Sequence, residues 1–388
     1  MAECGGAGMT RVHINGEIFR WACERSRINP FELRARFPHL EKWESGEALP
    51  TLKQLEKFAR AVRAPIGYLF LPSPPEEPNP LPDFRTIAGT PIARPSPDLL
   101  ETIYTCQERQ GWYREYAELF GESRLEYAAS VKVGDPVEGV ALEIRRVVGF
   151  EIEERRRLST WTEALRLFVA RVDKAGVMVM TSGVVGNDPH RGLDPGEFRG
   201  FAIADDYAPL IFINGADTKA AQMFTLAHEL AHIWLGITAL SDSSAAAMPN
   251  HNIEGWCNRV AAETLVPLRE FEKELKIAES IHEEVERLAR QFKVSTLVIL
   301  RRMMDVGALG REDFEREWRA EMDRLTTMRR GSGGNFYLTA AARVSRRFAR
   351  AVVESALEGR TLYRDAFHML GIKKHETFCR LSSALGYV

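Results

Sequence analysis

Apolar residues recur at helical spacing in the first part of the chain. Three stretches show this period and predict a small helical bundle over residues 15–26, 30–37 and 51–62. The third stretch opens with Thr51-Leu-Lys-Gln54, where a Thr and a Gln three residues apart form a capping-box pattern. A helix is therefore expected to begin at that point.

The central part of the chain changes its period twice. Residues 98–120 and 136–174 keep the helical period. Short β-rich runs separated by Gly, Asp and Pro then predict a small sheet at residues 176–180, 198–204 and 208–214. The helical period returns at Thr218 and continues to about residue 327, with a helix stop signal at Gly236. We therefore expect a mainly α-helical protein with a small β-sheet, which is the α+β class.

Prolines mark the first domain boundary. Ten of the 19 prolines lie between Pro65 and Pro97, and such a run cannot continue a helix. A Gly-rich segment at residues 330–334 marks a second joint. The predicted organisation is a helical domain at 1–75, a Pro-rich linker at 76–97, a central domain at 98–328 and a basic helical segment at 335–388.

The composition is that of an ordinary globular protein. The 388 residues are 45% hydrophobic and 27% charged, which excludes collagen-like, wholly disordered and membrane-spanning classes. No apolar run approaches about 18 residues, and the N-terminus lacks the pattern of a signal peptide. We therefore expect a cytoplasmic protein with no membrane partner. Five cysteines without a CxxC pair predict reduced thiols.

The net charge of −2 hides a basic C-terminal segment. Residues 328–388 carry eleven Arg or Lys against four acidic residues, a local charge of +7. Such an excess predicts contact with nucleic acid or with an acidic protein surface, and a solvated face is the alternative. The candidate contact residues are Arg343, Arg346, Arg347 and Arg350, which recur at helical spacing, and Lys373 and Lys374.

The pattern His228-Glu229-Leu230-Ala231-His232 carries the candidate chemistry. A spacing of four residues on a helix puts both imidazoles on one face, where two nitrogens can bind one zinc ion. Glu229 is offset so that it can approach a water molecule whose pKa zinc lowers towards about 7. A carboxylate there can take a proton and return it to a leaving amine. Two histidines on an ordinary surface helix are the alternative.

A catalytic zinc usually takes three protein ligands, so a further donor is expected downstream. The candidates are His251, Glu254 and Glu263. The apolar pattern of residues 251–267 predicts a second helix whose inward face begins at Glu254. Glu263 lies nine residues later, about half a rotation away. Glu254 is therefore preferred, with His251 second. The predicted strand at 208–214 could offer a sheet edge to an extended substrate, and a strand paired on both sides is the alternative.

These motifs resemble the ImmA/IrrE family of metallopeptidases. The resemblance covers about residues 165–300 and is carried by Phe224-Thr-Leu-Ala-His-Glu-Leu-Ala-His232, Glu254-Gly-Trp-Cys-Asn258 and Ala261-Ala-Glu-Thr-Leu-Val-Pro267. It implies that His228, His232 and Glu254 bind zinc and that Glu229 is the general base. Family members characteristically cleave a helix-turn-helix repressor, which implies a role in a stress or mobile-element response.

The N-terminal helices resemble the Xre (Cro/C1-type) helix-turn-helix family. The residues that carry this resemblance are Phe31-Glu-Leu-Arg-Ala-Arg-Phe37, Trp43-Glu-Ser-Gly46 and Pro50-Thr-Leu-Lys-Gln-Leu-Glu-Lys-Phe58. In that fold a recognition helix between the first two segments enters the major groove. Only residues 38–42 separate Phe37 from Trp43, about one helical turn fewer than expected. Sequence-specific DNA binding and protein docking or dimerisation are therefore both open.

The sequence as a whole predicts a zinc-dependent endopeptidase that acts on a regulatory protein, and the resemblance implies a repressor. The alternative is a non-catalytic, DNA-binding or antitoxin-like regulator that uses the metallopeptidase fold as a sensor or binding module. Residues 362–374 also predict a helix, a Gly turn and a basic helix, which is a possible second helix-turn-helix. Further candidate partners are DNA, a toxin or regulator encoded nearby, and a second copy of the chain.

Overall fold

The computed structural model describes residues 11–82, 86–87, 90–91, 95–241, 252–276, 280–327 and 343–387. The chain divides into two units, of which the first contains residues 1–80 and 92–103 and the second contains residues 81–91 and 104–388. Most described residues are helical, and the second unit holds a four-stranded mixed sheet. The expected α+β class is confirmed.

The first unit is a small helical bundle around an aromatic core. Its elements are α1 (Gly16–Ser26), α2 (Pro30–Arg36), α3 (Leu40–Glu44), α4 (Leu52–Ala61) and the 3₁₀ helix η1 (Ile66–Phe70). Four buried rings contact one another in the centre, those of Phe19, Phe37, Trp43 and Phe58. The capping box that the sequence predicts at Thr51 and Gln54 is present at the start of α4.

The third helix of the first unit is short. Helix α3 has five residues, or about one and a half turns. It follows Pro38, whose ring cannot continue the preceding helix. Glu41 and Lys42 point outward from it, while Leu40 and Trp43 are buried. Helix α3 therefore presents one acidic and one basic side chain on its outer face.

The second unit is organised around the mixed sheet. Its strands are β3 (Met178–Ser182), β4 (Gly200–Ile203), β5 (Leu210–Asn214) and β6 (Ala239–Ser241), in the order β3-β5-β4-β6. Strand β3 runs parallel to β5, whereas β4 is antiparallel to both β5 and β6. A separate two-stranded ribbon pairs β1 (Thr86–Ile87) with β2 (Thr90–Pro91). Strands β3, β4 and β5 were expected from the sequence, whereas β1, β2 and β6, the other strands of the described residues, were not.

Of the two interpretations of the strand at 208–214, the strand paired on both sides is confirmed, and the free edge is not. Strand β5 pairs with β3 on one side and with β4 on the other. All five of its residues are buried, as expected for a central strand covered on both faces. Within the described sheet, the terminal strands are β3 and β6.

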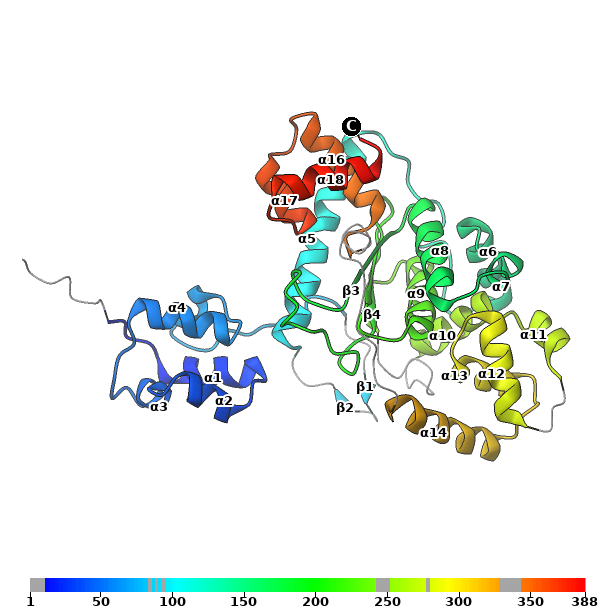
Figure 1. Ribbon diagram of the computed structural model, residues 1–388, viewed down its shortest axis with the longest axis horizontal. Helices are drawn as coiled ribbons and strands as arrows, with labels where there is room; N and C mark the ends of the chain where they lie inside the picture. Colours follow the sequence, from blue (N-terminus) through cyan, green and yellow to red (C-terminus); the bar gives the residue numbers. More distant parts are fainter. Residues whose placement is uncertain are drawn as a thin grey trace, which may run out of the picture. The chain divides into compact units, whose positions relative to one another are not determined.

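Helices surround the sheet and form one large core with it. Helices α8 and α9 pack against the strands, and α10 packs against α9 (Figure 1). The helices before the C-terminal segment are α5 (Pro97–Leu119), α6 (Val137–Val148), α7 (Ile152–Arg156), α8 (Trp161–Lys174), α9 (Lys219–Leu235), α10 (Asn252–Leu265), α11 (Leu268–Glu274), α12 (Ile281–Phe292), α13 (Thr296–Asp305) and α14 (Arg311–Thr327). None of the described helices has the length and apolar character needed to cross a membrane.

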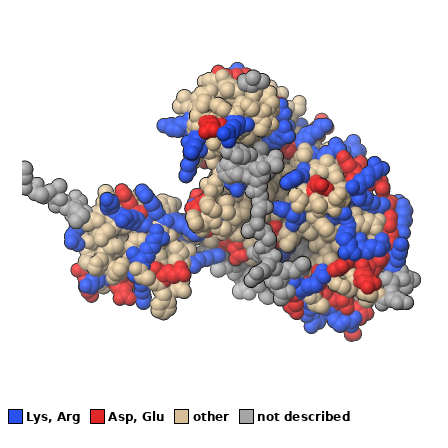
Figure 2. All heavy atoms as spheres, in the orientation of Figure 1, with Lys and Arg blue, Asp and Glu red and all other residues tan. Residues whose placement is uncertain are grey.

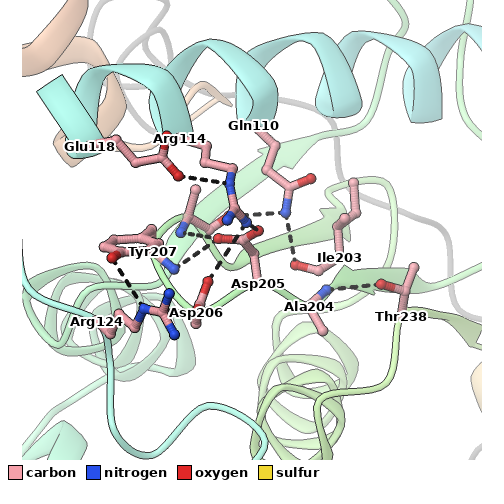
Figure 3. Close-up of polar contacts among 11 residues, drawn as sticks. Gln110, Arg114, Glu118, Arg124, Ile203, Ala204, Asp205, Asp206, Tyr207 and Thr238 are labelled. Atoms are coloured by element: carbon pink, nitrogen blue, oxygen red, sulfur yellow. Dashed lines mark hydrogen bonds and ion pairs between the residues drawn. The ribbon is translucent and has the colours of Figure 1, made fainter.

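Helix α5 is fastened to the turn between β4 and β5 (Figure 3). The Gln110 side chain donates to the carbonyl oxygens of Ile203 and Ala208 at 3.2 and 3.0 Å. Arg114 pairs with the Asp205 carboxylate, and the Asp205 side chain in turn accepts the Ala208 backbone N–H at 2.8 Å. The C-terminal half of α5 is therefore held rigidly against the sheet.

The C-terminal segment forms α16 (Arg346–Leu357), α17 (Tyr363–Leu370) and α18 (His375–Leu385). Its helix α16 is attached to the rest of the second unit by polar contacts. Ser345 and the backbone N–H of Arg347 both donate to the buried carboxylate of Asp173 on α8, at 2.5 and 2.8 Å. The Arg347 guanidinium pairs with Glu122. The Gly-rich joint expected at residues 330–334 lies outside the described residues.

Candidate metal centre

Helix α9 carries the HExxH pattern through the middle of the second unit. The Thr218 hydroxyl accepts the Ala221 N–H at the start of the helix, and Gly236 ends it in the left-handed conformation, with φ of 68°. This conformation suits a residue without a Cβ. Between these caps the residues from Gln222 to Leu235 are all buried. Burial on every side fixes the orientation of both histidine rings.

Helix α10 brings a carboxylate to the two histidines. Glu254 lies in its first turn, and its two oxygens lie 3.1 Å from Nε2 of His228 and 3.1 Å from Nε2 of His232. The two Nε2 atoms are 3.2 Å apart. All three side chains are buried. This trio is the group of His, Cys, Asp or Glu side chains within the described residues that could hold a metal ion.

An amide on the next turn of α10 fixes the protonation of His228. Its Nδ1 lies 2.8 Å from Oδ1 of Asn258, and an amide oxygen can only accept a hydrogen bond. The Nδ1 atom therefore carries a proton, and in the neutral ring the lone pair is on Nε2. That lone pair faces the carboxylate of Glu254. Such second-shell contacts orient metal-binding histidines and increase their basicity.

The donor set fits a small cation. Two nitrogen lone pairs and a carboxylate converge on one buried point, and without a cation or an extra proton between them they repel one another. Ligands at zinc distances in a tetrahedral site are about 3.4 Å apart, close to the separations of 3.1 to 3.2 Å between these atoms. The chemistry of two imidazoles and one carboxylate is that of catalytic zinc sites with an open position.

The pKa shifts of the three side chains also favour a cation at this point. Burial opposes protonation of His228, but the charge and hydrogen bond of Glu254 outweigh it and raise the pKa of His228 to about 9. Burial also opposes ionisation of Glu254, yet His228 and His232 lower the pKa of this carboxyl. Burial lowers the pKa of His232. The pocket thus favours a positive charge between the carboxylate and the rings.

Glu229 lies beside this trio against strand β4. A Cβ added at Gly200 would lie 3.2 Å from Oε1 of Glu229, 2.8 Å from the Phe212 carbonyl oxygen and 2.5 Å from Cγ2 of Thr225. Only glycine therefore permits the close approach of β4 to the helix at this point. Glu229 is fully buried, and it neighbours His228 in sequence without belonging to the trio.

Comparison with known proteins places this site in a recognised domain. Residues 172–304 match the family model described as the IrrE N-terminal-like domain, Peptidase M78. This part of the chain therefore has a peptidase-type domain of the IrrE kind, in a family whose metallopeptidase character implies a metal ion. Residues 344–383 match a domain of unknown function, DUF8813. No curated protein matches the chain.

The three candidate third ligands occupy different surroundings. Glu254 contacts both histidines. Glu263 lies on the same helix but pairs with Arg302 of α13 at 2.8 Å, and its oxygens accept the Leu268 N–H at 3.3 Å. His251 lies outside the described residues. The zinc-ligand and general-base roles of the site residues remain predictions and belong to the proposal below.

The predicted basic stripe, which consists of Arg343 before α16 and Arg346, Arg347 and Arg350 within it, does not form one exposed face. Arg343 donates to Asn187 at 2.5 Å and Arg347 donates to Tyr113 at 2.6 Å, so both are used in contacts within the chain. Arg346 and Arg350 are exposed. Figure 2 shows the C-terminal helices as a largely uncharged surface with Lys and Arg at its margins. The face does not present the four arginines together.

The expected basic helix near the C-terminus also differs from the structure. Lys373 and Lys374 are exposed, but both precede α18, which begins at His375. Within that helix Arg380 pairs with Glu376 at 2.6 Å, so its charge is balanced. The expected order of a helix, a Gly turn and a second helix is present as α17, a left-handed Gly371 and α18, but the second helix is not basic.

Two residues of the site had no role in the sequence analysis. Asn258 follows Glu254 by four residues, and this spacing places both on one face of a helix. That signal could have identified Asn258 as the partner of His228. Gly200 carries no comparable signal, because its closeness to Glu229 depends on how β4 packs against α9.

Proposed function

We propose that the second unit is a zinc-dependent endopeptidase that cleaves a regulatory protein in the cytoplasm. The observation that carries the proposal is the convergence of His228, His232 and Glu254 on one buried point, with Glu229 on the same helix beside them. The family match over residues 172–304 supports peptide-bond hydrolysis. A helix-turn-helix repressor as substrate is supported by the resemblance to the ImmA/IrrE family.

The proposed roles follow from the atoms that face the site. His228, His232 and Glu254 would hold zinc through their Nε2 and carboxylate oxygen atoms, with Asn258 retaining the proton on Nδ1 of His228. Zinc, when bound, acts as a Lewis acid that polarises a carbonyl and lowers the pKa of water towards about 7. Glu229 would accept a proton on its carboxylate and return it to the leaving amine nitrogen. Burial of all these groups excludes bulk water from the reacting atoms.

The substitution Glu229→Gln tests the base separately from the ligands. It removes the proton acceptor but retains the shape of the side chain, so cleavage should fall by roughly 100-fold or more. Zinc content, measured by elemental analysis of the purified protein, should stay at the wild-type level. If zinc and activity are lost together, Glu229 is a ligand, and the assignment of Glu254 as the third ligand must be revised.

We propose that the first unit is an Xre-like regulatory domain that docks a protein. The resemblance over residues 31–58 supports the family, and the short α3, with Glu41 on its outer face, favours protein docking over reading of the major groove. The full chain should therefore bind duplex DNA with little sequence preference. Tight binding to one sequence over a scrambled duplex of equal length would contradict this role.

A further inference from the structure

A cavity opens between helix α5 and the C-terminal helices of the second unit (Figure 1). Its volume is about 560 Å³, which is within the range of pockets that hold small organic ligands. One wall carries Glu108 and Trp112, one turn apart on α5, and the opposite wall is α17 with the turn that precedes it. All of these residues belong to the second unit. The cavity is therefore formed within one unit.

The walls of the cavity are held together by polar contacts beside it. The Arg109 side chain of α5 donates to the carbonyl oxygen of Met369 at 2.9 Å and to Sδ of Met180 on β3 at 3.6 Å, and Met369 lines the cavity. In the turn before α17, the Thr361 hydroxyl lies 2.8 Å from the hydroxyl of Ser355. The cavity therefore has a fixed shape, which reduces the ordering cost of binding a ligand.

An indole ring forms the apolar part of the α5 wall. Trp112 stacks on Tyr116 with a ring separation of 5.5 Å, and it contacts Phe348 of α16 nearly at a right angle. These contacts hold the ring in place, while Trp112 stays partly exposed and lines the cavity. Leu362 and Met369 add apolar surface from the opposite wall. An aromatic ring that is fixed but partly open can stack on a flat ring of a ligand.

Two guanidinium groups lie at the same cavity. Arg360 and Arg364 both line it, and their side chains are 52% and 86% exposed. Arg360 pairs with Glu358 at 2.9 Å, and Arg364 pairs with the adjacent Asp365 at 3.2 Å. Ion pairs as exposed as these contribute little to stability, so an entering anion can replace the carboxylates. Guanidinium groups bind phosphate through two parallel N–H donors.

The cavity also contains hydrogen-bond acceptors. Glu108 on one wall and Asp365 on the other both line it. Oε2 of Glu108 lies 3.5 Å from Nε2 of His368 on α17, and both side chains are more than half exposed. Carboxylates accept hydrogen bonds from hydroxyl and amino groups, and proteins use them in this way to bind ribose. A ligand that uses the whole cavity therefore carries hydrogen-bond donors as well as a flat ring and an anionic group.

We propose that this cavity binds a free mononucleotide. The base stacks on Trp112, and the phosphate pairs with Arg360 and Arg364. The hydroxyl or amino groups donate to Glu108 or Asp365. A simple anion leaves the indole and the carboxylates unused, and a neutral apolar ligand leaves both guanidinium groups unused. This inference does not depend on the proposed peptidase function, and it gives the C-terminal helices a role in binding a small molecule.

The test measures ligand binding to the full-length protein by isothermal titration calorimetry. The probes are the 5′-monophosphates of adenosine, guanosine, cytidine and uridine. Ribose 5-phosphate, the unphosphorylated nucleosides and inorganic phosphate serve as incomplete ligands. Arg364→Gln removes one guanidinium group, and Trp112→Leu removes the ring. Arg346→Gln is the matched control, because Arg346 is an exposed arginine of α16 outside the lining of the cavity.

We expect at least one of the four nucleotides to bind with a dissociation constant on the order of 10–100 μM, as for a ligand of this size. Ribose 5-phosphate and the nucleoside should each bind roughly tenfold more weakly or worse, because each lacks one principal contact. Arg364→Gln and Trp112→Leu should each weaken nucleotide binding by about tenfold, and Arg346→Gln should match the wild type. Thermal unfolding verifies that the variants are folded. Arg364 is mostly exposed, so its variant should fold even if Trp112→Leu does not.

Other results would contradict the proposal in distinguishable ways. If none of the four nucleotides binds, the cavity is not a nucleotide site. Equal affinity for a nucleotide and for ribose 5-phosphate or inorganic phosphate would indicate a simple anion site. Nucleotide affinity that is unchanged in Arg364→Gln would place the binding site elsewhere on the protein. Much tighter binding of a single-stranded oligonucleotide, with the same dependence on Arg364, would show a nucleic-acid contact instead of a site for a free nucleotide.

Discussion

Helix α10 carries two buried glutamates whose surroundings give them opposite roles. Among the described residues, Glu254 pairs with two imidazole nitrogens and with no Lys or Arg, whereas Glu263, nine residues later, faces the guanidinium of Arg302 at 2.8 Å. Both are about 5% exposed or less. The burial is therefore the same, and the permanent charge opposite each carboxylate differs. A buried carboxylate that already has an arginine is a structural group, and one that has only titratable partners can accept a metal ion.

The largest difference between the two glutamates should be in zinc binding. Glu254→Gln removes a charged ligand and should weaken zinc affinity by more than the roughly 10–100-fold that loss of an outer-shell partner costs. Glu263→Gln should leave the affinity within about twofold of the wild type, since its side chain contacts none of the site residues. Competition with a zinc chelator measures both. Equal affinities for wild type and Glu254→Gln would move the third ligand elsewhere.

For the stability of the fold, we expect the larger effect at Glu263 rather than at Glu254. Glu263→Gln leaves Arg302 buried without its nearest charge partner, a change that typically costs roughly 3–5 kcal/mol. We expect the lower end of that range, because Asp305 remains 3.1 Å from Arg302. Denaturant unfolding monitored by circular dichroism measures the loss. Combining Glu263→Gln with Arg302→Met should recover much of it, because no buried charge is then left unpaired. A fully stable single variant would contradict the structural role.

We expect a smaller effect on zinc binding from Asn258, the residue that contacts His228. Asn258→Ala removes the acceptor that holds the proton on Nδ1 of His228, and zinc affinity should fall by about tenfold. Asn258→Asp keeps an acceptor at the same position and should bind zinc at least as tightly as the wild type. The same chelator competition reports both variants. If Asn258→Ala binds zinc like the wild type, the orientation of His228 is set by packing alone.

The parts of the fold that the sequence could predict are those with local signals. The caps at Thr51, Thr218 and Gly236 and the helical spacing of His228 and His232 all act within a few residues, and the structure contains the helices they predict. Strand β6 has only three residues and exists because it pairs with β4, some 40 positions earlier. Such non-local pairing leaves no periodic pattern in a single sequence.

The strand at 208–214 and the predicted basic stripe show what a pattern along the sequence can and cannot decide. Strand β5 is buried throughout, and its run from Leu210 to Ile213 is apolar, a continuous pattern that is typical of a central strand. Arg343, Arg346, Arg347 and Arg350 were expected to form one stripe, because helical spacing shows which residues share a face but not what the face contacts. Contacts with Tyr113 and Asn187, far away in sequence, turn two of them inward.

The buried carboxylate of Asp173 ties the two matched segments into one folding unit. Burial raises the pKa of this group, while the hydrogen bonds from Ser345 and the Arg347 backbone oppose that rise. The donors belong to the segment at 344–383 and the acceptor to the segment at 172–304. A chain shortened after residue 304 would keep the carboxylate but lose both donors. Swapping the C-terminal helices between homologous proteins would therefore require exchanging α8 as well.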